Sequence, residues 1–185
     1  MCGHAEDQAS GLESALDVPG WLSITGSFRL RYEHMDNTFR IVGPAQDELL
    51  VSRLLVHARD TGERFYGGVE LQDSRAWLDQ DLTPVGTDDV NALEPLQLYA
   101  GYRTDKLDVQ LGRMTMDVGS RRLVARNLTR NTLNGFTGIN ARWTLPGRRA
   151  LQAFLTMPAA RLPNTLERSK LRNNEFVLDQ EHKER

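Results

Sequence analysis

The sequence predicts an all-β protein, an antiparallel up-and-down transmembrane β-barrel that is incomplete here, with about seven strands of a larger barrel. Three observations lead to this fold. Apolar and polar residues alternate along seven segments, short turns alternate with long polar links between those segments, and no stretch approaches the roughly 18 consecutive apolar residues of a transmembrane helix. In a barrel only alternate residues face lipid, so a mean hydropathy of −0.48 is compatible with this fold.

The first predicted strand, residues 22–33, shows the alternation most clearly. In the run LSITGSFRLRYE the even positions are apolar or glycine, and the odd positions are polar or charged. Such a strand, at about 3.3 Å per residue and tilted by about 40°, rises roughly 25 to 30 Å. This height matches the apolar band of an outer-membrane barrel.

Six further segments repeat the pattern: 50–59, 64–74, 96–103, 107–111, 137–143 and 151–157. Short turns at 60–62, 103–106 and 146–147 alternate with long polar links at 35–47, 75–93, 115–134 and from 158 onward. Bacterial barrels have this asymmetry, with the short turns in the periplasm. Aromatic residues near the strand ends fit the aromatic girdles of such barrels: Trp21, Tyr32, Phe65, Tyr102 and Trp143.

A soluble β-sandwich or a lipocalin-like barrel is the alternative fold, because its strands also alternate. In that case the apolar face would point inward and the polar face toward water. The strand length, the asymmetry of the links and the low aromatic content of 7% favour the membrane barrel.

Three regions are expected along the chain: a poorly ordered lead-in over 1–20, barrel strands over 21–160, and a loop with the truncated start of a further strand over 161–185. The first 20 residues lack the basic start and apolar run of a signal peptide. Seven strands cannot close, and an open sheet in lipid leaves backbone groups unpaired. We therefore expect a fragment that lacks its signal peptide and the C-terminal part of the barrel.

The polar face of the predicted strands would line a lumen, and its basic residues are almost all arginine: Arg29, Arg31, Arg53, Arg59, Arg64, Arg103 and Arg142. Further arginines lie near strand ends or in the links: Arg75, Arg113, Arg121, Arg122, Arg126 and Arg130. Acids fall largely in the turns and loops. Since arginine binds carboxylates bidentately, such a lumen would select carboxylated anions. The same arginines could instead brace the wall by pairing with Glu33, Glu70 or Asp108.

Other chemistry finds little support in the sequence. A net charge of −2 gives no reason to expect a nucleic-acid partner. The four histidines lack metal-ligand spacing, no serine has a nucleophile-elbow context, and no glycine-rich phosphate loop precedes a helix. We therefore predict no enzyme activity, no cofactor and no metal site.

Several runs resemble the alginate-export outer-membrane proteins: residues 26–33 (GSFRLRYE), 52–55 (SRLL), 65–75 (FYGGVELQDSR), 111–114 (LGRM) and 119–127 (GSRRLVARN). The resemblance spans about residues 16–159 and lies in the order and spacing of these runs. It implies a large monomeric barrel, on the order of eighteen strands, in the outer membrane of a Gram-negative bacterium. Alginate, a linear polyuronate, would pass an electropositive constriction by facilitated diffusion.

The resemblance also implies roles for individual residues. The pore-lining candidates are Arg31, Arg53, Arg75, Arg113 and Arg142, with Arg29 beside them and with Glu70 and Asp73 as bracing acids. Met114 stands where the family commonly has glutamine. The implied partners are the anionic polysaccharide, outer-membrane lipid and periplasmic proteins that deliver the polymer. A general porin for small organic anions and a non-transporting structural barrel remain alternative functions.

Overall fold

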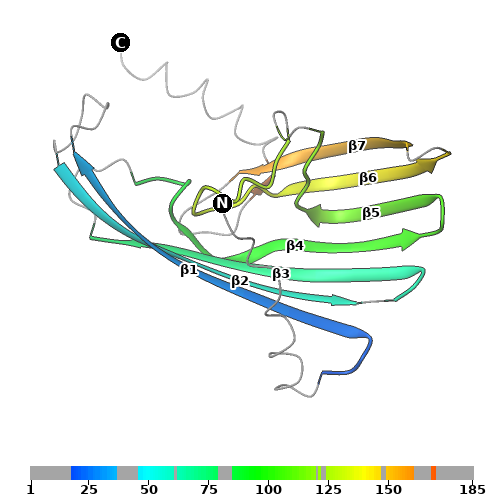
Figure 1. Cartoon of the computed structure of the whole chain (residues 1–185), viewed down its shortest axis with the longest axis horizontal. Helices are drawn as coiled ribbons and strands as arrows, with labels where there is room; N and C mark the ends of the chain where they lie inside the picture. Colours follow the sequence, from blue (N-terminus) through cyan, green and yellow to red (C-terminus); the bar gives the residue numbers. More distant parts are fainter. Residues whose placement is uncertain are drawn as a thin grey trace, which may run out of the picture.

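The computed structural model describes residues 18–36, 46–60, 62–78, 85–119, 121, 124–146, 149–160 and 168–169. Within these residues, eight strands pair antiparallel in chain order in one sheet (Figure 1). They are β1 (Leu22–Asp36), β2 (Gln46–Asp60), β3 (Phe65–Trp77), β4 (Asn91–Arg103), β5 (Leu107–Met114), β6 (Phe136–Leu145), β7 (Arg149–Ala160) and β8 (Arg168–Ser169). The predicted all-β, up-and-down class is confirmed.

All seven predicted strands are present, and several are longer than the sequence suggested. The pairing of β1 with β2 continues to Asp36 opposite Gln46, and the pairing of β2 with β3 continues to Leu50 opposite Trp77. The first two long links are therefore shorter than expected and span 37–45 and 78–90, whereas the third spans 115–135, close to its expected bounds. The expected lead-in over 1–20 lies outside the described residues except for 18–20, and the expected segment over 161–185 is described only at β8.

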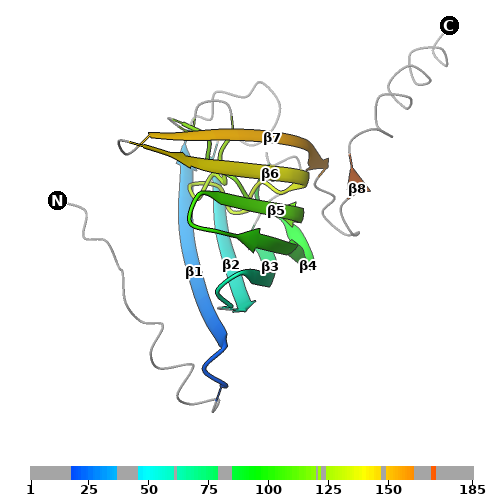
Figure 2. The ribbon, with the colours of Figure 1, turned by 90° about the vertical axis from the view of Figure 1, so that its right-hand side faces the viewer.

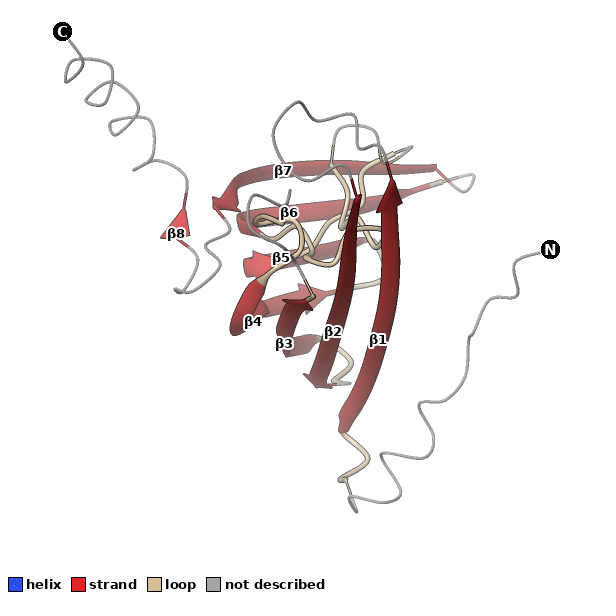
Figure 3. Ribbon diagram, turned by 90° about the vertical axis from the view of Figure 1, so that its left-hand side faces the viewer, coloured by secondary structure: helices blue, strands red, loops and turns tan. Residues whose placement is uncertain are grey.

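The sheet is strongly curved, as Figures 2 and 3 show, and loops gather on its concave side. It is not closed, because within the described residues β1 pairs only with β2. The two ends of the strands differ. The short-turn rim carries the links 61–64, 104–106 and 146–148, and the long-link rim carries the links 37–45, 78–90 and 115–135.

The two faces of the sheet have the burial pattern of a barrel wall. On the convex face large apolar side chains are exposed, with Leu155 at 82% and Phe65 at 73%. On the concave face polar side chains are buried, with Gln72 and Ser74 at 0%. A soluble sandwich would have the opposite pattern, so the soluble alternative is wrong. A convex face of this kind suits a lipid surrounding.

Aromatic side chains lie on the convex face near both rims. Phe65 and Tyr102 contact each other at the short-turn rim, with ring centroids 5.0 Å apart. Trp143 is exposed near the same rim, and Tyr32 and Trp77 are exposed toward the long-link rim. Their positions correspond to the interfacial girdles of membrane barrels. Among the described residues, no helix is long and apolar enough to cross a membrane.

The link 115–135, here called the inner loop, folds back against the concave face. Leu133 in this loop is fully buried and forms a small apolar cluster with Leu55 of β2 and Leu96 of β4. The amide of Leu133 also donates to Oε1 of Gln72 in β3 at 3.1 Å. The amide of Thr132 donates to the carbonyl of Asp88 at 3.0 Å, so the inner loop and the 78–90 link support each other.

Two glycines allow β5 to approach β4 closely and β6 to approach β7 closely. Gly112 has a φ of 123° and Gly138, its partner in register, has a φ of 155°. Both values lie in the region that only glycine adopts freely. A Cβ atom on Gly138 would lie 2.1 Å from the carbonyl oxygen of Leu155 in β7.

Candidate functional site

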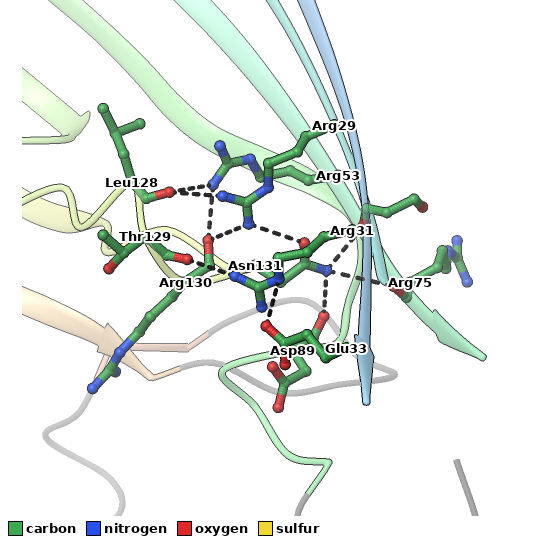
Figure 4. Close-up of polar contacts among 11 residues, drawn as sticks. Arg29, Arg31, Glu33, Arg53, Arg75, Asp89, Leu128, Thr129, Arg130 and Asn131 are labelled. Atoms are coloured by element: carbon green, nitrogen blue, oxygen red, sulfur yellow. Dashed lines mark hydrogen bonds and ion pairs between the residues drawn. The ribbon is translucent and has the colours of Figure 1, made fainter. Parts of the chain in front are cut away.

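Three arginines of β1 and β2 point from the concave face toward the inner loop (Figure 4). Arg29 and Arg53 lie opposite each other in the register of these two strands. Arg31 lies two residues further along β1, and therefore on the same face. Strand pairing alone thus places three positive charges side by side.

The backbone of the inner loop accepts hydrogen bonds from all three guanidinium groups. Nη1 of Arg29 donates to the carbonyl of Leu128 at 2.9 Å, and its Nη2 donates to that of Arg130 at 2.7 Å. Nη1 of Arg53 donates to the same two carbonyls at 3.2 and 2.9 Å. Arg31 donates to the carbonyl of Thr129 at 3.1 Å. Three consecutive carbonyl groups therefore point at the arginines.

Asn131 holds this part of the loop in place. Its side chain is fully buried, and its Nδ2 atom donates to the carbonyls of Ser52 at 2.9 Å and Asp89 at 2.7 Å. The hydroxyl of Ser74 in turn donates to the carbonyl of Asn131 at 3.0 Å. These bonds tie the loop to β2, β3 and the 78–90 link. Figure 4 shows Asn131 directly beside the arginines.

Four acids of the concave face each pair with one arginine: Glu33 with Arg31 at 2.7 Å, Glu94 with Arg113 at 3.2 Å, Glu70 with Arg126 at 3.0 Å, and Asp108 with Arg103 at 3.1 Å. The other arginines of this face have no ion pair with the described residues: Arg29, Arg53, Arg59 and Arg142. Within the described part of the chain, the concave face therefore has more arginines than acids to pair with them.

Arg29 and Arg53 each retain an unused donor. Their Nε atoms are buried and have no hydrogen-bond acceptor in the described structure. A buried donor of this kind costs about 1–3 kcal/mol, and more when it belongs to a charged group. This pair of guanidiniums therefore has donor capacity that a further acceptor would satisfy.

The structure brings together part of the set of residues expected from the sequence. Arg29, Arg31 and Arg53 meet at the inner loop, whereas Arg113 contacts Glu94 and Arg142 lies exposed on the concave face opposite Asp108 of β5. Glu70 is buried to 4% exposure and is held by Arg126 and Gln97. Met114, the departure from the family pattern, is fully buried.

Arg75 and Asp73 lie on the other face of the sheet. Asp73 is in register with Leu54, whose side chain is exposed on the convex face, and Nε of Arg75 contacts Asp73 at 2.9 Å. The alternation of β3 continues to Trp77, which places residues 73 and 75 on the same face as Leu71. The structure therefore does not bring this pair to the other candidate residues.

The sequence reasoning missed Glu94, Asn131 and the three loop carbonyls. Backbone acceptors have no signal in the sequence. Glu94 could not be placed by strict alternation, because the register shifts between two pairs, Glu70 with Gln97 and Leu71 with Pro95. After this shift Glu94 pairs with Gln72 and lies on the concave face. The sequence places Arg126 only among the arginines near strand ends or in the links, within the arginine-rich run 119–127, and does not indicate that it pairs with Glu70.

In the 78–90 link, beside the site, the carboxyl group of Asp89 has a displaced pKa. Burial raises the pKa of Asp89 above its ordinary value, and a hydrogen bond from the amide of Gly86 opposes this shift.

Among the described residues, no group of three or more histidine, cysteine, aspartate or glutamate side chains could hold a metal ion.

The comparisons with known proteins give one family. The model of the alginate export family matches residues 20–181. A search of curated proteins and a search of solved structures gave no match. The family is a family of outer-membrane transport proteins. Its match covers most of the chain and agrees with the up-and-down sheet and the apolar convex face. The chain belongs to the alginate export family.

Proposed function

We propose that this chain forms part of the wall of an outer-membrane channel that exports an anionic polysaccharide, an alginate-like polyuronate, by facilitated diffusion. The concave face would line the lumen, and the convex face would contact outer-membrane lipid. The observation that carries the proposal is the surplus of arginine on the concave face. Each acid of that face named above has an arginine partner, and Arg29, Arg53, Arg59 and Arg142 remain without one in the described structure.

The charge of these arginines is large enough to select ions. One unit charge about 4 Å away stabilises an anion by roughly 1 kcal/mol in bulk water and by roughly 4 kcal/mol at an effective dielectric constant of about 20. Since about 1.4 kcal/mol corresponds to a tenfold change in affinity, a single arginine can change the occupancy of a carboxylate severalfold or more. Several such charges along the wall would favour anions over cations.

The position of Arg29 and Arg53 suits a carboxylate on a moving polymer. Both donate at present to neutral backbone carbonyls of the inner loop. An ionised carboxylate is a stronger acceptor than a carbonyl, and a guanidinium can hold it bidentately. Neutral carbonyls therefore keep the arginines in place without neutralising them. A polymer that presents a carboxylate on every sugar could move from one arginine to the next, as conduction requires.

The asymmetry of the two rims suggests the orientation of the barrel. Short turns are periplasmic in bacterial barrels, so the short-turn rim would face the periplasm and the inner loop would come from the outer side. The polymer would then arrive at the short-turn rim, and periplasmic delivery proteins would be the partners there.

Planar-bilayer conductance of the complete protein tests the proposal. Under a salt gradient we expect an anion-selective current that polyuronate blocks and a neutral glucan of the same length does not. Arg53→Gln should weaken the block about tenfold. Arg149→Gln, which removes the same charge from the exposed first residue of β7, whose Nε atom donates to the carbonyl of Pro146, should leave the block unchanged.

Two results would contradict the proposal and identify another function. An anion-selective current that is indifferent to polyuronate would indicate a general porin for small organic anions. A folded protein without any conductance would indicate a structural barrel.

A further inference from the structure

A second feature of the concave face lies at the short-turn rim, away from the inner loop. Here β2 to β5 enclose a hollow of about 380 Å³. Its lining includes charged, aromatic and amide side chains: Arg59, Tyr66, Tyr99, Arg103, Asp108 and Gln110. None of these residues takes part in the arginine cluster around Arg29 and Arg53.

Two tyrosines of the hollow lean against the wall, each over a glycine of the neighbouring strand. Tyr99 of β4 is in register with Gly68 of β3, and Tyr66 of β3 is in register with Gly101 of β4. A Cβ atom on Gly68 would lie 2.7 Å from the hydroxyl oxygen of Tyr99, and one on Gly101 would lie 2.1 Å from Cζ of Tyr66. The rings therefore occupy the space that side chains would otherwise fill, and they cover the wall instead of projecting from it.

Three side chains of the hollow, Tyr66, Arg103 and Asp108, are bound to one another. The guanidinium of Arg103 lies over the Tyr66 ring, 4.5 Å from its centroid, and its Nε atom contacts Asp108 at 3.1 Å. The hydroxyl of Tyr66 donates to the same carboxylate. One face of the Tyr66 ring is thus against Gly101 and the other is under Arg103, so this trio serves as a fixed support.

Arg59, Tyr99 and Gln110 are the side chains that remain for a ligand. The side chain of Arg59 is exposed and has no hydrogen bond or ion pair with any residue that the structure describes. Tyr99 is half-buried, with its hydroxyl 3.4 Å from Nε2 of His57. Its ring meets that of Tyr66 at an interplanar angle of 67°, which leaves it tilted away from the support.

We infer that this hollow is a subsite for one carboxylated sugar unit. The apolar face of a pyranose ring would lie on Tyr99, the sugar carboxylate would bind Arg59, and the amide of Gln110 would bind a hydroxyl group. An aromatic ring combines an apolar face with a polar tip, and an arginine adds selection for the anion. The inference rests on the proposed function and on its orientation, under which an exported polymer meets this subsite first.

The rate at which polyuronate oligomers block the channel from each side of a planar bilayer tests this inference. The complete protein is inserted with its orientation fixed by an epitope tag on the long-link side and an antibody in one chamber. With oligomer added on the short-turn side, Arg59→Gln and Tyr99→Leu should each lower the association rate roughly threefold, because one exposed ion pair and one aromatic contact each contribute on the order of 1 kcal/mol or less. Addition from the long-link side should show no change.

Two control variants separate the subsite from general effects of charge and folding. Arg149→Gln removes an arginine from the same rim outside the hollow and should match the wild type. Tyr99→Phe keeps the ring over Gly68 and should retain the wild-type rate, because the inference assigns stacking to the ring and not to the hydroxyl.

The outcomes distinguish this inference from the proposed function. A wild-type channel that polyuronate blocks normally, with Arg59→Gln unchanged or with Arg149→Gln equally impaired, would refute the subsite and leave the export channel standing. A wild-type channel that polyuronate blocks from neither side would contradict the proposed function itself, and the subsite with it.

Discussion

Replacing Arg29 and Arg53 with glutamine, singly and together, should loosen the inner loop by more than the sum of the single effects. Both guanidiniums donate to the same two acceptors, the carbonyls of Leu128 and Arg130, at distances between 2.7 and 3.2 Å. In either single variant the other arginine still holds both carbonyls. In the double variant the two carbonyls lose every donor that the described structure gives them.

The magnitude follows from these shared bonds. A hydrogen bond that involves a charged group contributes roughly 1.5–3 kcal/mol. A single variant also removes the repulsion between two adjacent positive charges, so we expect a loss of only about 1 kcal/mol in the docking of the loop. The double variant should lose about 3 kcal/mol. The coupling between the two sites would then be about 1 kcal/mol, within the usual range for residues that share partners.

Hydrogen exchange measures the opening of the loop directly. The amides of Thr132, Leu133 and Asn134 donate to acceptors on the 78–90 link, on β3 and within the loop, and their protection reports its docking. Each 1.4 kcal/mol should speed their exchange about tenfold. Arg142→Gln, on the same face and without a bond to the loop, is the control. Strictly additive effects, or a double variant with wild-type protection, would refute the reasoning.

Three further predictions concern the wall and the link beside the site. Leu155→Arg, midway along β7 on the convex face, should destabilise the barrel in lipid by about 2–4 kcal/mol in urea titrations, whereas Gln152→Arg on the concave face should be nearly neutral. Gly138→Ala should prevent normal folding, seen as loss of the heat-resistant band on gels, because its Cβ would meet a backbone oxygen at 2.1 Å. The raised pKa of Asp89 means that the docked link binds its proton more tightly than the open one, so docking should weaken as pH rises from 3.8 through the raised value. After correction for intrinsic rates, the Thr132 amide should therefore exchange faster as the pH rises through this range, and Asp89→Asn should abolish this pH dependence.

The fold could be predicted from the sequence because period two is a local property of each strand. The run LSITGSFRLRYE shows which side chains share a face without any knowledge of their neighbours. The same rule placed Arg29, Arg31 and Arg53 together correctly. It was not carried through to the end of β3, where the alternation puts Asp73, within the predicted segment 64–74, and Arg75, just beyond it, on the convex face with Leu71.

The partners of the arginines could not be predicted, because they depend on contacts across long stretches of chain. Arg29 and the carbonyl of Leu128 are 99 residues apart, and a carbonyl acceptor has no side chain to reveal it. The position of Glu94 depends on a bulge next to Leu96 that moves the register by one residue. Sequence reasoning thus identified the charged face, and the structure showed which charges the protein itself neutralises.

Flux of polyuronate through the complete protein tests the central claim most directly. Vesicles containing the protein would be loaded with equal concentrations of a fluorescent polyuronate and a neutral glucan of the same length in a different colour. We predict rapid release of the polyuronate, retention of the glucan, and a clear slowing of release in the Arg29→Gln, Arg53→Gln double variant. Equal release of both polymers, or retention of both by a correctly folded protein, would contradict the claim that the arginines of this face conduct a polyanion.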